Sequence, residues 1–159
     1  MSRKKFICPK MDRKILDEWL NNLLQKRKDL ADTKLKRTRM LMNAAFENAN
    51  VIGHEKFIDS IWLPDENDRH VLAAAIQGNA TFIITNNLKD FPKSKLEEHN
   101  IEAISPDVFI LRLIEADKQA VLEAFDKLIE SLKDPPRTKI QMLDTLEKCG
   151  LKKSVGLLR

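Results

Sequence analysis

Two neighbouring stretches of the sequence decide the expected fold. The first reads LPDENDRHVLAAA at positions 63–75, and the second reads FIITNNLKDFP at positions 82–92. Acidic residues ahead of the alanine-rich run suit the start of a helix, because carboxylates there accept hydrogen bonds from free N–H groups. A helix over Arg69–Gln77 is therefore predicted, with Gly78 and Asn79 ending it. The β-branched apolar run Thr81–Thr85 predicts a buried core strand followed by a polar loop.

Working outward from these stretches, predicted helices alternate with short predicted strands. Helical spacing of apolar residues and helix-start signals predict six more helices: after the cap Asp12, after Asp32-Thr33, a short one after Pro92, from Ser105-Pro106 to Leu132, from Thr138 to about Lys148, and a short basic one after Gly150. Short strands are expected at Phe6–Cys8, Val51–Ile52 and Glu102–Ile104. This alternation predicts an α/β fold with a parallel sheet flanked by helices.

Composition limits the class of protein. The chain has 159 residues, which suits one domain with a small appendage, and 43% of them are hydrophobic, enough to form a core. No apolar run reaches the roughly 18 residues that span a bilayer. The N-terminus has no apolar region adequate for a secretion signal, so the cytoplasm is the expected compartment. Cys8 and Cys149 form no metal or redox motif and are interpreted as buried or incidental thiols.

The net charge of +4 weakly favours an acidic partner such as nucleic acid. Much of the positive charge is concentrated in one segment of fourteen residues, which contains Lys26, Arg27, Lys28, Lys34, Lys36, Arg37 and Arg39. A solvated helix face explains such a run, and contact with phosphates is the alternative.

Three acidic residues are candidates for a common site. Asp90 follows the predicted core strand, Asp68 opens the alanine-rich helix, and Glu18 lies on the first helix. Active sites in parallel α/β sheets lie at the carboxyl ends of the strands, so we expect these carboxylates to converge in one cleft. Converging carboxylates without a basic partner favour a hard divalent cation, Mg²⁺ or Mn²⁺, which can activate water.

Each of these acids also has a simpler interpretation. Asp68 could only cap its helix, and the same interpretation is preferred for Asp65. Asp90 could be a surface turn residue, and Glu18 could be a solvated helix carboxylate. Spacing alone leaves these alternatives open.

The two stretches quoted first resemble the second half of a PIN domain, in which an aspartate opens an alanine-ending helix and a strand and a T-x-N-x-x-D-F loop follow. The first helix and the segment after Pro135-Pro136 extend the resemblance to VapC-like toxins over nearly the whole chain. It implies a metal-dependent endoribonuclease toxin, using Mg²⁺ or Mn²⁺, that is neutralised by an antitoxin protein. The acidic metal ligands and catalytic residues that it implies are Glu18, Asp68 and Asp90, with Asp65 as an accessory metal ligand and Thr85 and Asn87 as polar catalytic-loop positions.

One departure from the family pattern concerns the N-terminus. A PIN domain begins with a strand that ends in an aspartate, whereas Phe6–Cys8 fits the family's second strand. We therefore expect an N-terminally truncated PIN-like domain over residues 1–134, without the first strand and first catalytic aspartate, and a helical extension over residues 135–159.

Two consequences follow from that expected truncation. Unpaired strand edges favour a homo-oligomer or a partner segment that adds a strand. The loss of one acid predicts that the isolated chain cleaves RNA poorly. A catalytically defective remnant that binds RNA or an antitoxin without cutting is the alternative function. The strand 82–85 argues against a third class, a plain helical interaction protein.

Overall fold

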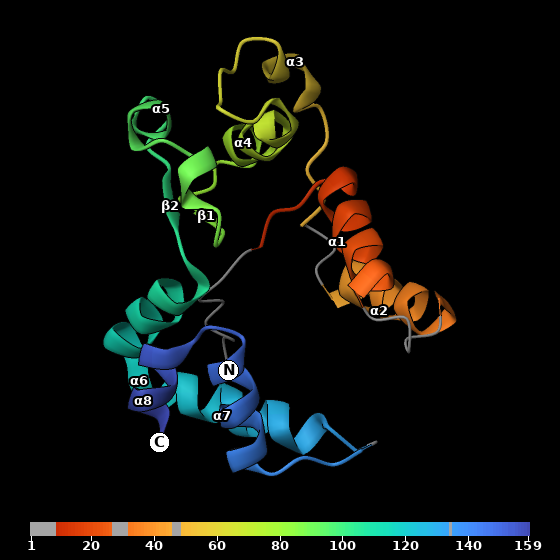
Figure 1. Cartoon of the computed structure of the whole chain (residues 1–159), viewed down its shortest axis with the longest axis vertical. Helices are drawn as coiled ribbons and strands as arrows, with labels where there is room; N and C mark the ends of the chain where they lie inside the picture. The colour runs from red at the N-terminus through yellow and green to blue at the C-terminus, as the bar shows by residue number, and fades with distance from the viewer. Residues whose placement is uncertain (1–8, 27–31, 46–48, 134) are drawn as a thin grey trace, which may run out of the picture. The chain divides into compact units, whose positions relative to one another are not determined.

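The chain folds into two compact units. The computed structural model describes residues 9–26, 32–45, 49–133 and 135–159 (Figure 1). The N-terminal unit lies within residues 1–83 and 89–102, and the C-terminal unit comprises residues 84–88 and 103–159. The strand expected at Phe6–Cys8 lies outside the described residues. Among the described residues, no helix is both long and apolar enough to cross a bilayer.

The N-terminal unit is mainly helical, and the predicted helices are present. Its elements are α1 (Arg13–Lys26), α2 (Asp32–Ala45), α3 (Glu55–Ile58), the 3-10 helix η1 (Glu66–Asp68), α4 (Arg69–Gln77) and α5 (Lys93–Glu97). Asp12 caps α1 as predicted, because its Oδ1 accepts a hydrogen bond from the N–H of Ile15 at 2.6 Å. The four-residue helix α3 was not predicted, since it is too short to show a periodic pattern.

The alanine-rich helix α4 is the buried centre of this unit. Its buried residues include Leu72, Ala73, Ala74 and Ala75. The three alanine side chains are small, so neighbouring segments can lie close to the helix. Gly78 ends the helix as predicted. A Cβ there would lie 3.1 Å from the Ala74 carbonyl oxygen and 3.2 Å from a methyl group of Val51. Any other residue at position 78 would therefore require its neighbours to shift by a few tenths of an ångström.

The described sheet contains two short strands. β1 (Phe82–Ile84) and β2 (Glu102–Ile104) pair in parallel, with 3.0 Å hydrogen bonds from Glu102 N–H to the Thr81 carbonyl and from Thr85 N–H to the Ile104 carbonyl. The α/β class is therefore confirmed in a mostly helical form. The strand is shorter than Thr81–Thr85 and is not buried on both faces, because Ile84 is 42% exposed.

A second strand prediction needs correction. The segment expected as a strand at Val51–Ile52 forms only an isolated parallel bridge between Met11 and Asn50. The N–H of Met11 donates to the Ala49 carbonyl at 2.8 Å, and the N–H of Val51 donates to the Met11 carbonyl at 2.9 Å. Two hydrogen bonds hold this pairing, and the chain turns away at Gly53, whose φ is +76°.

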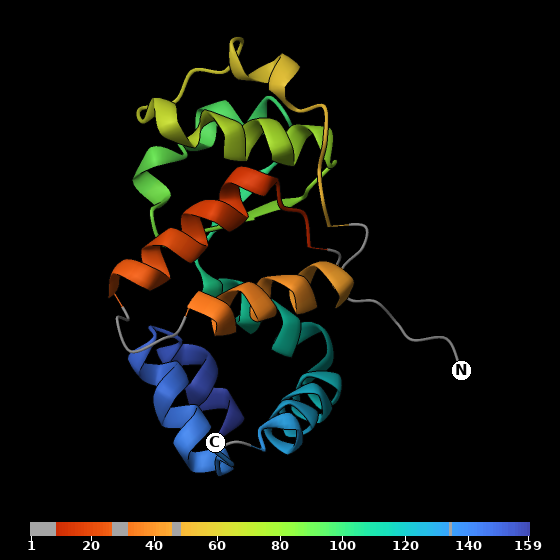
Figure 2. The ribbon, with the colours of Figure 1, turned by 90° about the vertical axis from the view of Figure 1, so that its right-hand side faces the viewer.

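The described helices of the C-terminal unit pack around a core of their own, and Figure 2 draws them in teal to blue. They are α6 (Pro106–Ser131), α7 (Lys139–Lys148) and α8 (Lys152–Leu158). The buried apolar side chains between them are Ile114, Phe125, Leu143, Val155 and Leu158. The predicted helix after Ser105-Pro106 is present, but it kinks at Asp117, where φ is −160°. Oδ1 of Asp117 accepts a hydrogen bond from Ala120 N–H at 3.0 Å and so caps the second half of α6.

Asp107 joins the start of α6 to the start of α8. Its Oδ1 accepts from the backbone N–H and the hydroxyl of Ser154 at 2.9 and 2.6 Å, and its Oδ2 accepts from the N–H of Lys153 at 3.2 Å. Burial alone would raise the pKa of Asp107, but these hydrogen bonds and the charge of Lys153 outweigh it and lower the pKa below its usual value. The ionised carboxylate is therefore the form that stabilises this helix junction.

We expect Asp107→Ala to lower the free energy of unfolding by about 1.5–3 kcal/mol at neutral pH, because it removes hydrogen bonds to a charged acceptor. Since the folded-state pKa is lowered, this stabilisation is complete above the unfolded value of about 4 and is lost as the pH falls through the folded value. Urea unfolding at pH 7 and pH 3 measures both effects.

The matched control for Asp107 is Asp126→Ala in the same unit. Asp126 is exposed and contacts only Lys139 among the ion pairs described, at 2.9 Å. Such a surface pair contributes about 0–1 kcal/mol. An equal loss of stability for the two variants would show that Asp107 does not hold α6 and α8 together.

Candidate active site

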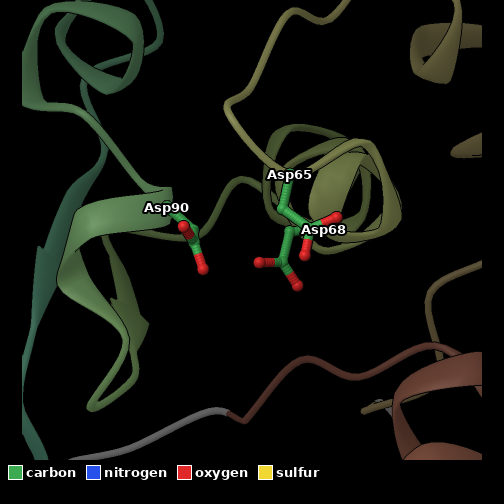
Figure 3. A group of neighbouring side chains, drawn as sticks. All are labelled: Asp65, Asp68 and Asp90. Atoms are coloured by element: carbon green, nitrogen blue, oxygen red, sulfur yellow. The ribbon is translucent and has the colours of Figure 1, made fainter.

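Three aspartates of the N-terminal unit form a compact acidic cluster. Each of Asp65, Asp68 and Asp90 offers a carboxylate oxygen that lies within 4.8 Å of the others. Figure 3 shows their side chains extending into the same space. Asp65 and Asp68 flank the 3-10 helix η1 ahead of α4, and Asp90 ends the 3-10 turn η2 (Leu88–Asp90) that follows β1.

Local geometry assigns different roles to Asp65 and Asp68. Asp65 adopts an extended backbone, and its Oδ1 accepts a hydrogen bond from the N–H of Asn67 at 2.9 Å, so it caps η1. Asp68 precedes α4 but makes no side-chain capping bond. The capping interpretation is therefore supported for Asp65 and not for Asp68. The carboxylate of Asp68 instead faces the other two acids.

The electrostatics of Asp68 reflect this crowding. Burial raises the pKa of Asp68, and the negative charges of Asp65 and Asp90 raise it further, whereas His70 lowers it. The ionised side chain is thus destabilised in the absence of a positive partner. A hard divalent cation, which prefers oxygen ligands, would relieve both the desolvation and the repulsion. The donor set and its electrostatics therefore fit a Mg²⁺ or Mn²⁺ ion.

Glu18 lies beside this cluster and is not one of its three members. Its negative charge contributes to the raised pKa of Asp68, after the larger effects of Asp65 and Asp90. The Glu18 side chain is 47% exposed, with one oxygen 3.7 Å from Lys14 Nζ and the other 3.6 Å from His70 Nε2. Of the three acids expected to converge, Asp68 and Asp90 lie in the acidic cluster and Glu18 lies beside it. Asp65 is the third member of the cluster.

The two polar loop candidates shape the turn after β1. The N–H of Asn87 donates to the hydroxyl oxygen of Thr85 at 3.0 Å, which closes a local turn between them. Both residues precede Asp90 on the same loop. Their predicted catalytic role remains a prediction.

The basic segment 26–39 contains at least one side chain that is already paired with an acid. Arg39 of α2 forms an ion pair with Asp17 of α1. Arg27 and Lys28 lie outside the described residues. Contact of this segment with phosphates stays a prediction.

Sequence reasoning gave no role to His70, although it is buried next to the acids. Only 3% of the residue is exposed. Its Nδ1 lies 2.6 Å from the carbonyl oxygen of Asn67. The only sequence signal is its position two residues after Asp68, which alone does not distinguish it from an ordinary core histidine.

Two known protein families match separate parts of the chain. Residues 1–89, more than half of the chain, match the PIN domain family. The chain belongs to the PIN-domain family. Residues 106–159 match a second family, described as the VapC50 C-terminal domain, which covers α6, α7 and α8. The range matched by the PIN family therefore contains α4, Asp65 and Asp68, and Asp90 directly follows it.

One curated relative is similar to about half of the chain. The chain is 39% identical over 79 residues to a Mycobacterium tuberculosis (strain ATCC 25618 / H37Rv) protein named "Putative ribonuclease VapC50". This alignment covers 50% of the chain and 47% of the relative, so the chain matches about half the length of that protein. No solved structure matches the chain.

Proposed function

We propose that this PIN domain is a metal-dependent endoribonuclease of the VapC toxin type. The observation that carries this proposal is the group of three carboxylates within 4.8 Å, in which burial and neighbouring charges raise the pKa of Asp68. The family membership and the name of the relative support RNA as the substrate class.

The chain's own residues would have separate tasks in this reaction. Asp65, Asp68 and Asp90 would hold a Mg²⁺ or Mn²⁺ ion, and Glu18 would contribute negative charge from the edge of the site. When bound, such an ion supplies an activated water and offsets charge on the phosphodiester. The Thr85–Asn87 hydrogen bond would hold the loop ahead of Asp90 in a fixed shape.

RNA cleavage by the full chain is expected to require a divalent ion. Purified protein is incubated with a 5′-labelled, unstructured RNA in Mn²⁺, in Mg²⁺ or in EDTA, and products are resolved by length. We expect slow internal cleavage with either ion and none in EDTA, because the carboxylates alone repel an anionic phosphate. A DNA strand of the same sequence serves as the control for substrate class.

Two outcomes would contradict the proposal. Cleavage that continues unchanged in EDTA would show that the acidic cluster does not use a metal. Tight RNA binding without cleavage in either ion would favour the alternative function, a PIN domain that binds RNA or an antitoxin without cutting.

We also propose a set of partners and a compartment, based on the family resemblance. An antitoxin protein would neutralise the chain, the chain would form a homo-oligomer, and both would act in the cytoplasm, where RNA is present. Light scattering of the purified chain at micromolar concentration measures the assembly. A monomer under these conditions would contradict the homo-oligomer.

A further inference from the structure

The strongest unexplained feature is the buried imidazole of His70. Its side chain is only 4% exposed, and its Nδ1 lies 2.6 Å from the carbonyl oxygen of Asn67. Because a carbonyl can only accept, Nδ1 must carry the hydrogen. In the neutral ring, this leaves Nε2 with a lone pair and no hydrogen.

Within the described part of the chain, Nε2 of His70 has no hydrogen-bond partner. It is buried, and no group of the described chain forms a hydrogen bond with it. The nearest charged group is the carboxylate of Glu18, with Oε2 at 3.6 Å. This separation is too long for a hydrogen bond. Buried polar atoms in native proteins almost always have a partner, so a group from outside the described residues is expected here.

The spacing of these two atoms suits a shared metal ion. Zn²⁺ and similar ions bind imidazole nitrogen and carboxylate oxygen at about 2.0–2.2 Å, which places two ligands about 3.4–3.6 Å apart at tetrahedral to trigonal angles. The observed 3.6 Å falls at the upper end of that range. Metal-binding histidines also usually donate their other ring N–H to a carbonyl or carboxylate, as His70 does to Asn67.

The electrostatic surroundings favour a cation at this position. Glu18 adds a negative charge that acts on Asp68, which already carries the repulsion of Asp65 and Asp90. Glu18 is half exposed, so an ion could enter from its side and keep water as its remaining ligands.

We propose that His70 Nε2 and the Glu18 carboxylate are two ligands of a divalent transition-metal ion, such as Zn²⁺ or Co²⁺, beside the acidic cluster. The nitrogen ligand distinguishes this site from the all-oxygen set of Asp65, Asp68 and Asp90. Imidazole suits transition metals, whereas Mg²⁺ prefers oxygen, so this site selects Zn²⁺ or Co²⁺ over Mg²⁺. The inference does not depend on RNA being the substrate.

Imidazole NMR gives a direct test, because the chain has three histidines. The full chain is labelled with ¹⁵N-histidine, its signals are assigned with His70→Gln and His99→Gln, and Zn²⁺ or Mg²⁺ is added up to one equivalent. We expect Zn²⁺ to shift the Nε2 signal of His70 and Mg²⁺ to leave it unchanged. The signal of the exposed His99 serves as the internal control for surface binding.

Calorimetry with Co²⁺ tests the second ligand. Glu18→Gln should weaken Co²⁺ binding at least about 10-fold, as loss of a metal-site group usually does. Glu18 is half exposed, so this variant is expected to fold even if His70→Gln does not. Glu55→Gln is the matched control, since Glu55 is an exposed glutamate of α3 whose carboxylate is 4.0 Å from a different histidine, His54.

Three results would overturn the inference. One is a His70 signal that Zn²⁺ does not move. Another is a doubly protonated His70 ring with or without Zn²⁺, which would identify a simple imidazolium–carboxylate pair. The last is equal Co²⁺ affinity of the native chain and Glu18→Gln. RNA cleavage in Mg²⁺ is measured separately, so its absence would contradict the proposed function without affecting this site.

Discussion

Asp68→Asn is expected to reduce RNA cleavage at least about 100-fold, beyond the roughly 10- to 100-fold lost with groups that only support a metal ligand. The asparagine amide keeps the size of the side chain but removes the negative charge at the middle of the acidic cluster. The same substitution should not destabilise the metal-free protein, because burial and the charges of Asp65 and Asp90 raise the pKa of Asp68.

The sign of that stability effect follows from the raised pKa. A carboxyl group whose folded-state pKa lies above its unfolded value destabilises the fold when it is ionised, and this penalty disappears as the pH falls through the folded value. At neutral pH and in EDTA, Asp68→Asn should therefore melt at the same temperature as the native chain or higher. Added Mn²⁺ should raise the melting temperature of the native chain more than that of the variant.

Asp59→Asn is the matched control for this prediction. Asp59 is an exposed aspartate of the same unit and follows α3. We expect it to leave both cleavage and the response to Mn²⁺ unchanged. A fully active Asp68→Asn variant would remove Asp68 from the site, and a strongly destabilised one would show that the residue has a structural task instead.

Asp12→Ala is expected to lower the free energy of unfolding by about 3–5 kcal/mol, the usual loss when one partner of a buried charge pair is removed. Asp12 is 1% exposed, and its Oδ2 lies 2.9 Å from Nε2 of the buried His54. Their alignment is not that of a hydrogen bond, and the contact is an ion pair when His54 is protonated. The same side chain caps α1 through the N–H of Ile15.

Asp12→Asn separates the two tasks of this residue. The amide oxygen can still accept from Ile15, so the cap, which contributes about 1 kcal/mol, should survive while the charge is lost. Urea unfolding of Asp12→Asn, Asp12→Ala, His54→Ala and the double variant gives the coupling between the two side chains. A loss of less than about 1 kcal/mol for Asp12→Ala would contradict the buried pair, since a cap alone explains that much.

The sequence predicted the helices better than the sheet. The helix Arg69–Gln77 and its end at Gly78 were correct, because the capping residues and the alanine run are local signals. Thr138 likewise begins α7 with a capping box that includes Gln141. Strands depend on partners far away in the chain, which explains why the segment at Val51 forms only a bridge and why Ile84 is exposed.

The candidate site was predicted in part. Asp68 and Asp90 were placed together because a helix start and a strand-following loop meet at the same edge of an α/β unit. Spacing favoured a cap for Asp65, and the family resemblance implied an accessory metal ligand; the structure shows that Asp65 both caps η1 and joins the cluster. Glu18 was expected to converge with Asp68 and Asp90 but lies beside the acidic cluster, because the direction in which a helix turns its side chain depends on packing against other elements. Its role as a metal ligand stays a prediction.

By itself, the sequence determined the local elements, the PIN-like order of helix, strand and loop, and two acids of the cluster. Each of these depends on residues within a few positions of one another, where capping and periodicity act. The tertiary structure alone decided which distant groups meet: Asp12 with His54, Glu18 with His70, and Asp107 with Ser154. Such contacts depend on how elements far apart in the sequence pack against one another, and no spacing along the chain encodes that packing.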